Sequence, residues 1–183
     1  MDKRIILGRK KYNYVHMALL KDGYELLSQL NLVDFNLKKL ADHSKYSITT
    51  VYEHFDSSVE VFLIEFFGYL RKKRIEEYQQ IYTVNEKENI KLMFIKFSKF
   101  MNDEHLLWRN LKAARVLIDN TEIKPFFLID ELVLQAEAIN LKPELIEKII
   151  NLFYKYENAF LENSLKSEKL TTKFIDDLTN SLN

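Results

Sequence analysis

A short run of hydroxyl, aromatic and imidazole side chains, SITTVYEHF at positions 47–55, holds the residue types best suited to binding chemistry. At about 100° per residue, Val51 and Phe55 share one side of a helix, which predicts that both are buried. The opposite side carries Thr49, Tyr52 and Glu53. Hydroxyl and imidazole groups can donate to phosphate oxygens, and a helix N-terminus adds partial positive charge. The run therefore predicts a helix that presents polar groups to phosphates and base edges.

The edges of that helix and the elements around it follow from the same reasoning. Thr50 and His54 flank the buried side on one edge, and Ile48 flanks it on the other. Asn36 is the expected N-cap of a helix over Leu37–Ser44, and Ser47 that of the helix over Ile48–Phe55. Two short helices joined by a tight turn form a helix-turn-helix unit.

A basic segment precedes this unit. Residues 1–11 contain five basic residues (Lys3, Arg4, Arg9, Lys10 and Lys11) and one acidic residue, Asp2, a local charge of +4 in a chain of formal net charge +0. Such a segment can follow a phosphate backbone. It can equally be a solvated, frayed terminus, and the sequence leaves both readings open.

The rest of the chain predicts an all-α protein of about nine helices. Gly is 3 and Pro is 2, which disfavours turn-rich β folds, and Cys is 0, which excludes disulfides and thiolate metal sites. Ser57 and Glu60 form an S-x-x-E capping box that opens a long helix to about Tyr82. The other expected helices cover Tyr12–Leu30, Glu86–Met101, His105–Ile118, Pro125–Ala138, Pro143–Asn163 and Lys169–Leu182.

No signature of catalysis is present in the sequence. Three glycines allow no phosphate-cradling loop, and no G-x-S-x-G elbow occurs. The histidines, at 16, 43, 54 and 105, form no i, i+4 pair of metal ligands, and RKKR at 71–74 fits a solvated helix face. We expect no enzyme activity, cofactor or metal site. No apolar run spans a bilayer and no signal peptide is seen, so a cytoplasmic protein is expected.

The stretch LADHSKYSITTVYEHFDSSVEVF, beginning at Leu40, resembles the DNA-binding signature of the tetracycline-repressor (TetR) family. The resemblance covers about residues 10–65 and implies an N-terminal three-helix DNA-binding domain followed by a larger helical ligand-binding and dimerisation domain. We place the boundary between 1–56 and 57–183. By the resemblance, Tyr52 and His54 contact phosphates, and Lys38 contacts DNA from the preceding helix. Thr49 and Thr50 lie within reach of base edges, and Ile48 either makes an apolar contact there or is partly buried. Ser47 caps the helix, and Arg9, Lys10 and Lys11 belong to the basic arm.

The chain also departs from the family pattern. Lys45 stands where the turn usually has Gly, so the turn is either a strained left-handed one or differently shaped, and Lys45 can add a phosphate contact. Ser58 stands where the family commonly has Lys, and Ile48 replaces a polar reader. These departures motivate an alternative, a protein–protein adaptor of the same fold that has lost DNA binding.

The back half is expected to hold the dimer interface and a ligand pocket. The helix over Pro143–Asn163 has a wide apolar face that can pack both its own core and a partner. By the resemblance, the last two helices of each subunit form a four-helix interface, and ordinary core helices of a monomer are the alternative. The candidate interface residues are Ile149, Phe153, Tyr156, Phe160, Phe174 and Leu178. The resemblance implies a pocket among the middle helices, with Met93, Phe97, Trp108, Arg115 and Phe127 as candidate lining, although such an aromatic stripe also suits a core. We thus expect a homodimeric repressor that binds a palindromic operator. By the resemblance an unidentified small molecule releases it, and a regulator that has no effector is the alternative.

Overall fold

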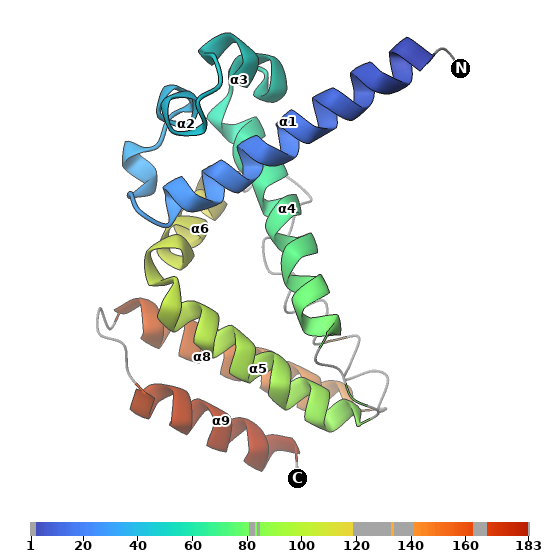
Figure 1. Ribbon diagram of the computed structural model, residues 1–183. Coiled ribbons are helices and arrows are strands. Elements are labelled where there is room, and N and C mark those ends of the chain that lie inside the picture. Colours follow the sequence, from blue (N-terminus) through green and yellow to red (C-terminus); the bar gives the residue numbers. More distant parts are fainter. Residues whose placement is uncertain are drawn as a thin grey trace. The chain divides into compact units, whose positions relative to one another are not determined.

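The computed structural model describes residues 3–80, 83, 85–118, 133, 141–162 and 168–182 (Figure 1). Within these ranges the chain forms eight α-helices, one short 3-10 helix and no strand, which confirms the all-α prediction. The elements are α1 (Lys3–Leu27), η1 (Leu32–Asp34), α2 (Leu37–Ser44), α3 (Ile48–Phe55), α4 (Val59–Gln79), α5 (Glu86–Asp103), α6 (His105–Leu117), α8 (Pro143–Glu162) and α9 (Glu168–Leu182). Apart from residue 133, the helix predicted over Pro125–Ala138 lies outside the described residues.

Two compact units make up the chain. Unit 1 comprises Met1–Leu70 and Leu106–Pro125, and unit 2 comprises Arg71–His105 and Phe126–Asn183. In these units, α6 and the first half of α4 belong with α1–α3. The predicted boundary at residue 56 between a DNA-binding and a regulatory domain stays a prediction. Among the described helices, none combines the length and apolar composition that a bilayer span requires.

Aromatic side chains form the centre of unit 1. The Phe62 ring of α4 lies 4.8 Å from the Phe35 ring and 5.1 Å from the Phe55 ring, centroid to centroid. Gly23 of α1 faces the same ring, and a Cβ at this position would lie 2.5 Å from Phe62 Cζ. The absence of a side chain at Gly23 therefore allows α1 and α4 to approach closely.

The end of α1 differs from the prediction. We expected a helix to Leu30, but α1 ends at Leu27, and Asn31 is extended, with φ −70° and ψ 148°. The buried side chain of Asn110, on α6, explains the difference. Its Nδ2 donates to the carbonyl oxygens of Leu27 and Leu30, each at 2.7 Å, and its Oδ1 accepts from the Leu32 amide at 2.8 Å. A distant side chain thus satisfies carbonyls that a left-handed turn would otherwise satisfy.

The junction between α3 and α4 also departs from the sequence pattern. Asp56 and Ser57 both have left-handed backbones, with φ 49° and φ 57°. An N-cap needs an extended backbone, so Ser57 cannot cap α4 and the predicted Ser57–Glu60 capping box is wrong. Ser58 takes the role one residue later, because its Oγ accepts from the Val61 amide at 3.3 Å.

Unit 2 has its own aromatic core, in which α9 packs against α8 and α5. The Phe153 ring of α8 lies 4.5 Å from Phe97 of α5, and the Phe174 ring of α9 lies 4.8 Å from Phe94 and 4.6 Å from Tyr156. The Tyr156 hydroxyl donates to the Asp177 carboxylate. Burial, and then this hydrogen bond, raise the pKa of Tyr156 above its ordinary value.

Candidate nucleic-acid interface

Two side-chain caps define the helix-turn-helix of unit 1, as predicted. Asn36 Oδ1 accepts from the Lys39 amide at 2.9 Å where α2 begins, and Ser47 Oγ accepts from the Thr50 amide at 3.1 Å where α3 begins. Between the two helices, Lys45 has φ 62°. The turn is therefore the left-handed one, and Lys45 takes a conformation that costs a non-glycine residue roughly 1 kcal/mol.

The faces of α3 match the predicted phase. Val51 and Phe55 are fully buried, whereas Tyr52 is 41% exposed and Thr49 and Glu53 are also exposed. Ile48 and Thr50 lie at intermediate exposure, on the edges of the buried side. Two fully buried anchors thus hold an eight-residue helix whose outer face carries hydroxyl groups, one of them phenolic.

His54 lies inside unit 1, with only 7% of its surface exposed. Its ring stacks on Tyr12 of α1 at 4.1 Å between centroids, and its Nδ1 lies 3.2 Å from Nδ1 of His16. Packing against α1 thus occupies the ring that the resemblance assigned to a phosphate. In the structure the His54 ring contacts α1, and the phosphate contact predicted for His54 stays a prediction.

The basic segment is helical. We expected the first helix to begin near Tyr12, but α1 begins at Lys3, so the basic residues extend that helix by more than two turns (Figure 1). Arg9, Lys10 and Lys11 are exposed there, and Lys38 and Lys45 are exposed in and after α2. The structure thus gives residues 3–11 a helical backbone, and a contact of this segment with DNA stays a prediction.

The departure at Ser58 has a local structural explanation. Because its hydroxyl caps α4, a lysine at this position would lose that hydrogen bond. The cation that the resemblance leads one to expect is replaced by a cap.

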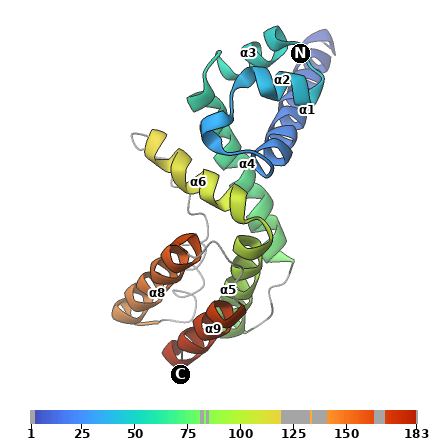
Figure 2. The same cartoon turned by 90° about the vertical axis from the view of Figure 1, so that its left-hand side faces the viewer.

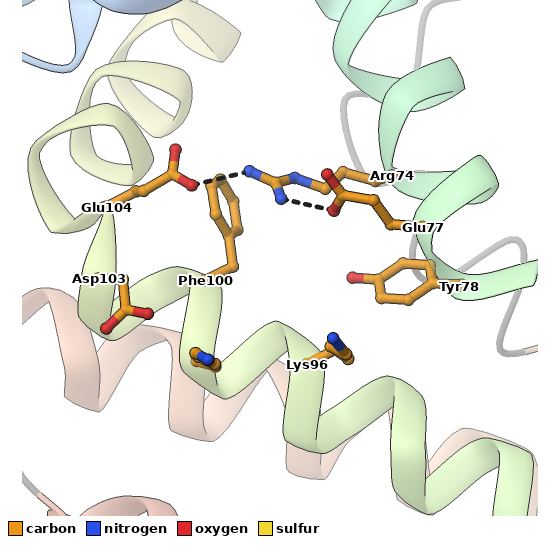
Figure 3. A pocket seen from close by; sticks show the side chains of 8 residues that line it. Arg74, Glu77, Tyr78, Lys96, Phe100, Asp103 and Glu104 are labelled. Atoms are coloured by element: carbon orange, nitrogen blue, oxygen red, sulfur yellow. Dashed lines mark hydrogen bonds and ion pairs between the residues drawn. The ribbon is translucent and has the colours of Figure 1, made fainter. Parts of the chain in front are cut away.

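The predicted ligand-pocket residues do not line the cavity described in unit 2. Met93 and Phe97 are buried core residues of unit 2, Trp108 and Arg115 belong to unit 1, and Phe127 lies outside the described residues. That cavity measures about 180 Å³ and is lined by Arg74, Glu77, Tyr78, Lys96, Lys99, Phe100, Asp103 and Glu104 (Figure 3). The predicted pocket stays a prediction, and this cavity is a different one, lined mostly by charged side chains.

Arg74, which lines this cavity, is buried. The RKKR segment at 71–74 had instead predicted a solvated helix face. The Arg74 guanidinium donates to Glu77 Oε2 at 2.7 Å and to Glu104 Oε1 at 3.2 Å, and it lies 3.8 Å above the Phe100 ring (Figure 3). Burial raises the pKa of the neighbouring Tyr78 above its ordinary value, so this phenol is neutral. No group of three or more His, Asp or Glu side chains suited to a metal ion occurs among the described residues.

The side chains predicted for a subunit interface are buried within one chain. Ile149, Phe153, Tyr156, Phe160, Phe174 and Leu178 each have at most 2% of their surface exposed. They pack α8 and α9 into the core of unit 2, which a single chain needs for its own stability. A subunit interface on these helices therefore has to use other residues of α8 and α9.

Comparison with known proteins shows which solved structures share the fold of this chain. No protein-family model matches the sequence, and no curated protein does. A solved structure assigned to the TetR family of transcriptional regulators, from Rhodococcus sp., has a TM-score of 0.68 and 14% identity, over 92% of this chain and 98% of the other. A TetR transcriptional regulator from Rhodococcus sp. RHA1 gives 0.65 and 10%, over 94% and 97%. This chain has a TetR-like fold. At such low identity the likeness concerns the helices and their order.

Three residues that make structural contacts in unit 1 were not predicted from the sequence. His16 and Glu65 meet His54 inside unit 1, and Asn110 holds the end of α1. Each contacts residues at least 38 positions away along the chain or on another helix, with no local spacing to reveal the contact. A lone Asn within the apolar pattern of α6 was the one available signal, since a buried amide needs partners.

Proposed function

We propose that this protein is a sequence-specific regulator of transcription that binds double-stranded DNA through α3 and represses as a homodimer. The observation that carries the proposal is the outer face of α3, where the exposed Tyr52 and Thr49 stand on a helix anchored by Val51 and Phe55. A short capped helix with a polar outer face suits the major groove of DNA. The TetR-like fold supports the same proposal.

The exposed and half-buried residues of α3 and the nearby cations each have a role under this proposal. Tyr52 donates its hydroxyl to a phosphate and fixes the docking angle of α3. Thr49 and Thr50 reach base edges from the first turn, and Ile48 offers an apolar contact to a thymine methyl group. The cations Lys38, Lys45, Arg9, Lys10 and Lys11 bind phosphates, which supplies affinity without sequence preference.

The dimer follows from the symmetry of the DNA site. A palindromic operator presents two half-sites about one helical turn apart, and a two-fold dimer matches that spacing. We therefore expect two chains, or a multiple of two, on each operator. Analytical ultracentrifugation measures the number of chains in the free protein and the number of chains on each operator.

An effector would act through unit 2. A small molecule bound in the cavity beside Arg74 could release DNA only by binding the two dimer geometries with unequal affinity. The lining of this cavity contains three cationic and three acidic side chains, so a polar molecule fits the cavity better than an apolar one.

The deciding experiment is selection from random duplex DNA. The wild-type chain should enrich an inverted repeat, whereas Tyr52→Ala should not, because a phosphate contact that orients α3 is lost. Tyr154→Ala provides a matched control, since it removes the same kind of side chain from α8 in unit 2. If a folded wild-type dimer enriches no sequence at low salt, the proposal is wrong, and a protein partner becomes the object of the search.

A further inference from the structure

The two histidines of unit 1 that touch each other form a short chain with one glutamate. His16, on α1, places its Nε2 2.5 Å from Oε2 of Glu65, on α4. Its other ring nitrogen, Nδ1, lies 3.2 Å from Nδ1 of His54, on α3. Three helices of unit 1 are thus joined through one line of hydrogen-bonding groups, and one of them is the candidate recognition helix.

The geometry limits how many protons the two histidine rings can hold while their hydrogen bond persists. A carboxylate oxygen accepts, so His16 Nε2 carries a hydrogen toward Glu65. The two Nδ1 atoms face each other at hydrogen-bonding distance, which requires one hydrogen between them: one nitrogen donates and the other accepts. The pair can be neutral or carry a single positive charge and keep this bond. When both rings are protonated, two N–H groups face each other, and the bond is replaced by repulsion.

The surroundings of His54 act in the same direction. Burial, followed by the neighbouring His16, lowers the pKa of His54, and Glu53 on its own helix opposes them. From α1 the ring faces Tyr12 and His16, and α4 contributes Glu65 through His16. The proton that breaks the bond therefore enters only when the solution is more acidic than the ordinary histidine pKa of 6.5.

We propose that the His16–His54 pair, held by Glu65, is a proton-sensitive clamp that positions α3, so that a second proton on the pair weakens binding to duplex DNA. The DNA-binding half of this inference rests on the proposed function, but the clamp itself does not. Tyr52 lies two residues before His54 on a helix of eight residues, so a shift of His54 moves the surface that would meet DNA. His54 is thus a positioning residue, and protonation is the signal it responds to.

The clamp also makes the stability of the fold depend on pH. The unfolded chain binds the His54 proton at an ordinary histidine pKa of 6.5, and the folded chain binds it only at lower pH. Between the two values the unfolded state holds more protons, so the free energy of unfolding falls as the pH drops below about 6.5. Above that value this contribution to stability is fully present.

The sign of the pH effect on DNA affinity separates this inference from a direct phosphate contact. If His54 touched a phosphate, protonation would strengthen the contact, and affinity would rise as the solution is acidified. The clamp predicts the reverse for the wild-type chain. We expect the dissociation constant to increase about tenfold from about pH 7.5 to about pH 5.5.

The DNA experiment compares variants at those two pH values on the selected duplex. His54→Gln and His16→Gln remove one titrating ring each and should flatten the pH profile to within about threefold. His43→Gln is the matched control, because His43 forms a separate pair with Glu25, at 3.6 Å, away from the clamp. It should keep the wild-type profile. A wild-type profile that is flat or rises toward acid overturns the inference, as does a wild-type profile retained in both clamp variants.

A second measurement needs no DNA and tests the clamp even if the proposed function fails. Nuclear magnetic resonance of the ring protons in the free wild-type chain should show the pair titrating in two separated steps. The amide signals of α3 should shift with the more acidic step, and Glu65→Gln should alter both steps. Independent titration of His16 and His54, with α3 signals unchanged, would contradict the clamp whether or not the protein binds DNA.

Discussion

At the scale of single residues, the close approach of α1 and α4 in unit 1 depends on one missing side chain. A Cβ at Gly23 would lie 2.5 Å from Phe62 Cζ and 2.9 Å from its Cε2, closer than van der Waals contact allows. The Phe62 ring cannot easily move away, because it is fully buried and stacked against Phe35 and Phe66. Helix propensity favours Ala over Gly, so packing and propensity oppose each other here.

At Gly23 we expect the steric cost of an added Cβ to exceed the gain in helix propensity. Gly23→Ala should lower the free energy of unfolding by about 1–3 kcal/mol, the usual cost of overfilling a core. Gly68→Ala is the matched control, since nothing lies within 4 Å of a Cβ at this position, and it should raise stability by up to about 1 kcal/mol. Urea denaturation followed by circular dichroism measures both. Equal effects of the two substitutions would show that the contact with Phe62 is unimportant.

At the scale of elements, hydrogen bonds at helix ends decide where the helices of unit 1 stop. The caps at Asn36 and Ser47 are local and were readable from the sequence. The end of α1 is set by Asn110, whose amide makes three hydrogen bonds to the main chain near Leu27–Leu32. Because Asn110 is buried, water cannot replace these bonds when the side chain is removed.

Truncating Asn110 should therefore be costly. Asn110→Ala leaves two carbonyls and one amide without this partner, and we expect a loss of roughly 2–4 kcal/mol in the free energy of unfolding. Asn13→Ala, at an exposed position of α1, should change it by less than about 0.5 kcal/mol. Thermal and urea unfolding provide the comparison. A loss at Asn110 no larger than at Asn13 would refute the role assigned to this side chain.

At the scale of the whole molecule, charge is balanced overall but not evenly distributed. The formal net charge is +0, yet the segment at positions 1–11 has a charge of +4. The structure places Arg9, Lys10 and Lys11 at exposed positions of α1, in the same compact unit as α2 and α3. A segment that is already helical loses less conformational entropy on binding a phosphate backbone than an unstructured tail would.

The salt dependence of DNA affinity tests this distribution. Replacing Arg9, Lys10 and Lys11 together by Gln should reduce the slope of log affinity against log salt by roughly 0.9 for each lost phosphate contact. Neutralising Lys96, Lys99 and Lys155 instead removes the same charge from exposed positions of unit 2 and should leave the slope nearly unchanged. If both triple variants change the slope equally, the helical arm does not contact DNA.

The sequence by itself determined the all-α class, both caps of the helix-turn-helix and the faces of α3. Caps and faces depend on residues within four positions of one another, so spacing alone reveals them. Only the tertiary structure decided that His54 is buried against His16, that Asn110 ends α1 and that the predicted interface residues of α8 and α9 form the core of unit 2. In each case the side chain contacts a helix that is distant in the sequence, so only the packing of the helices determines the contact.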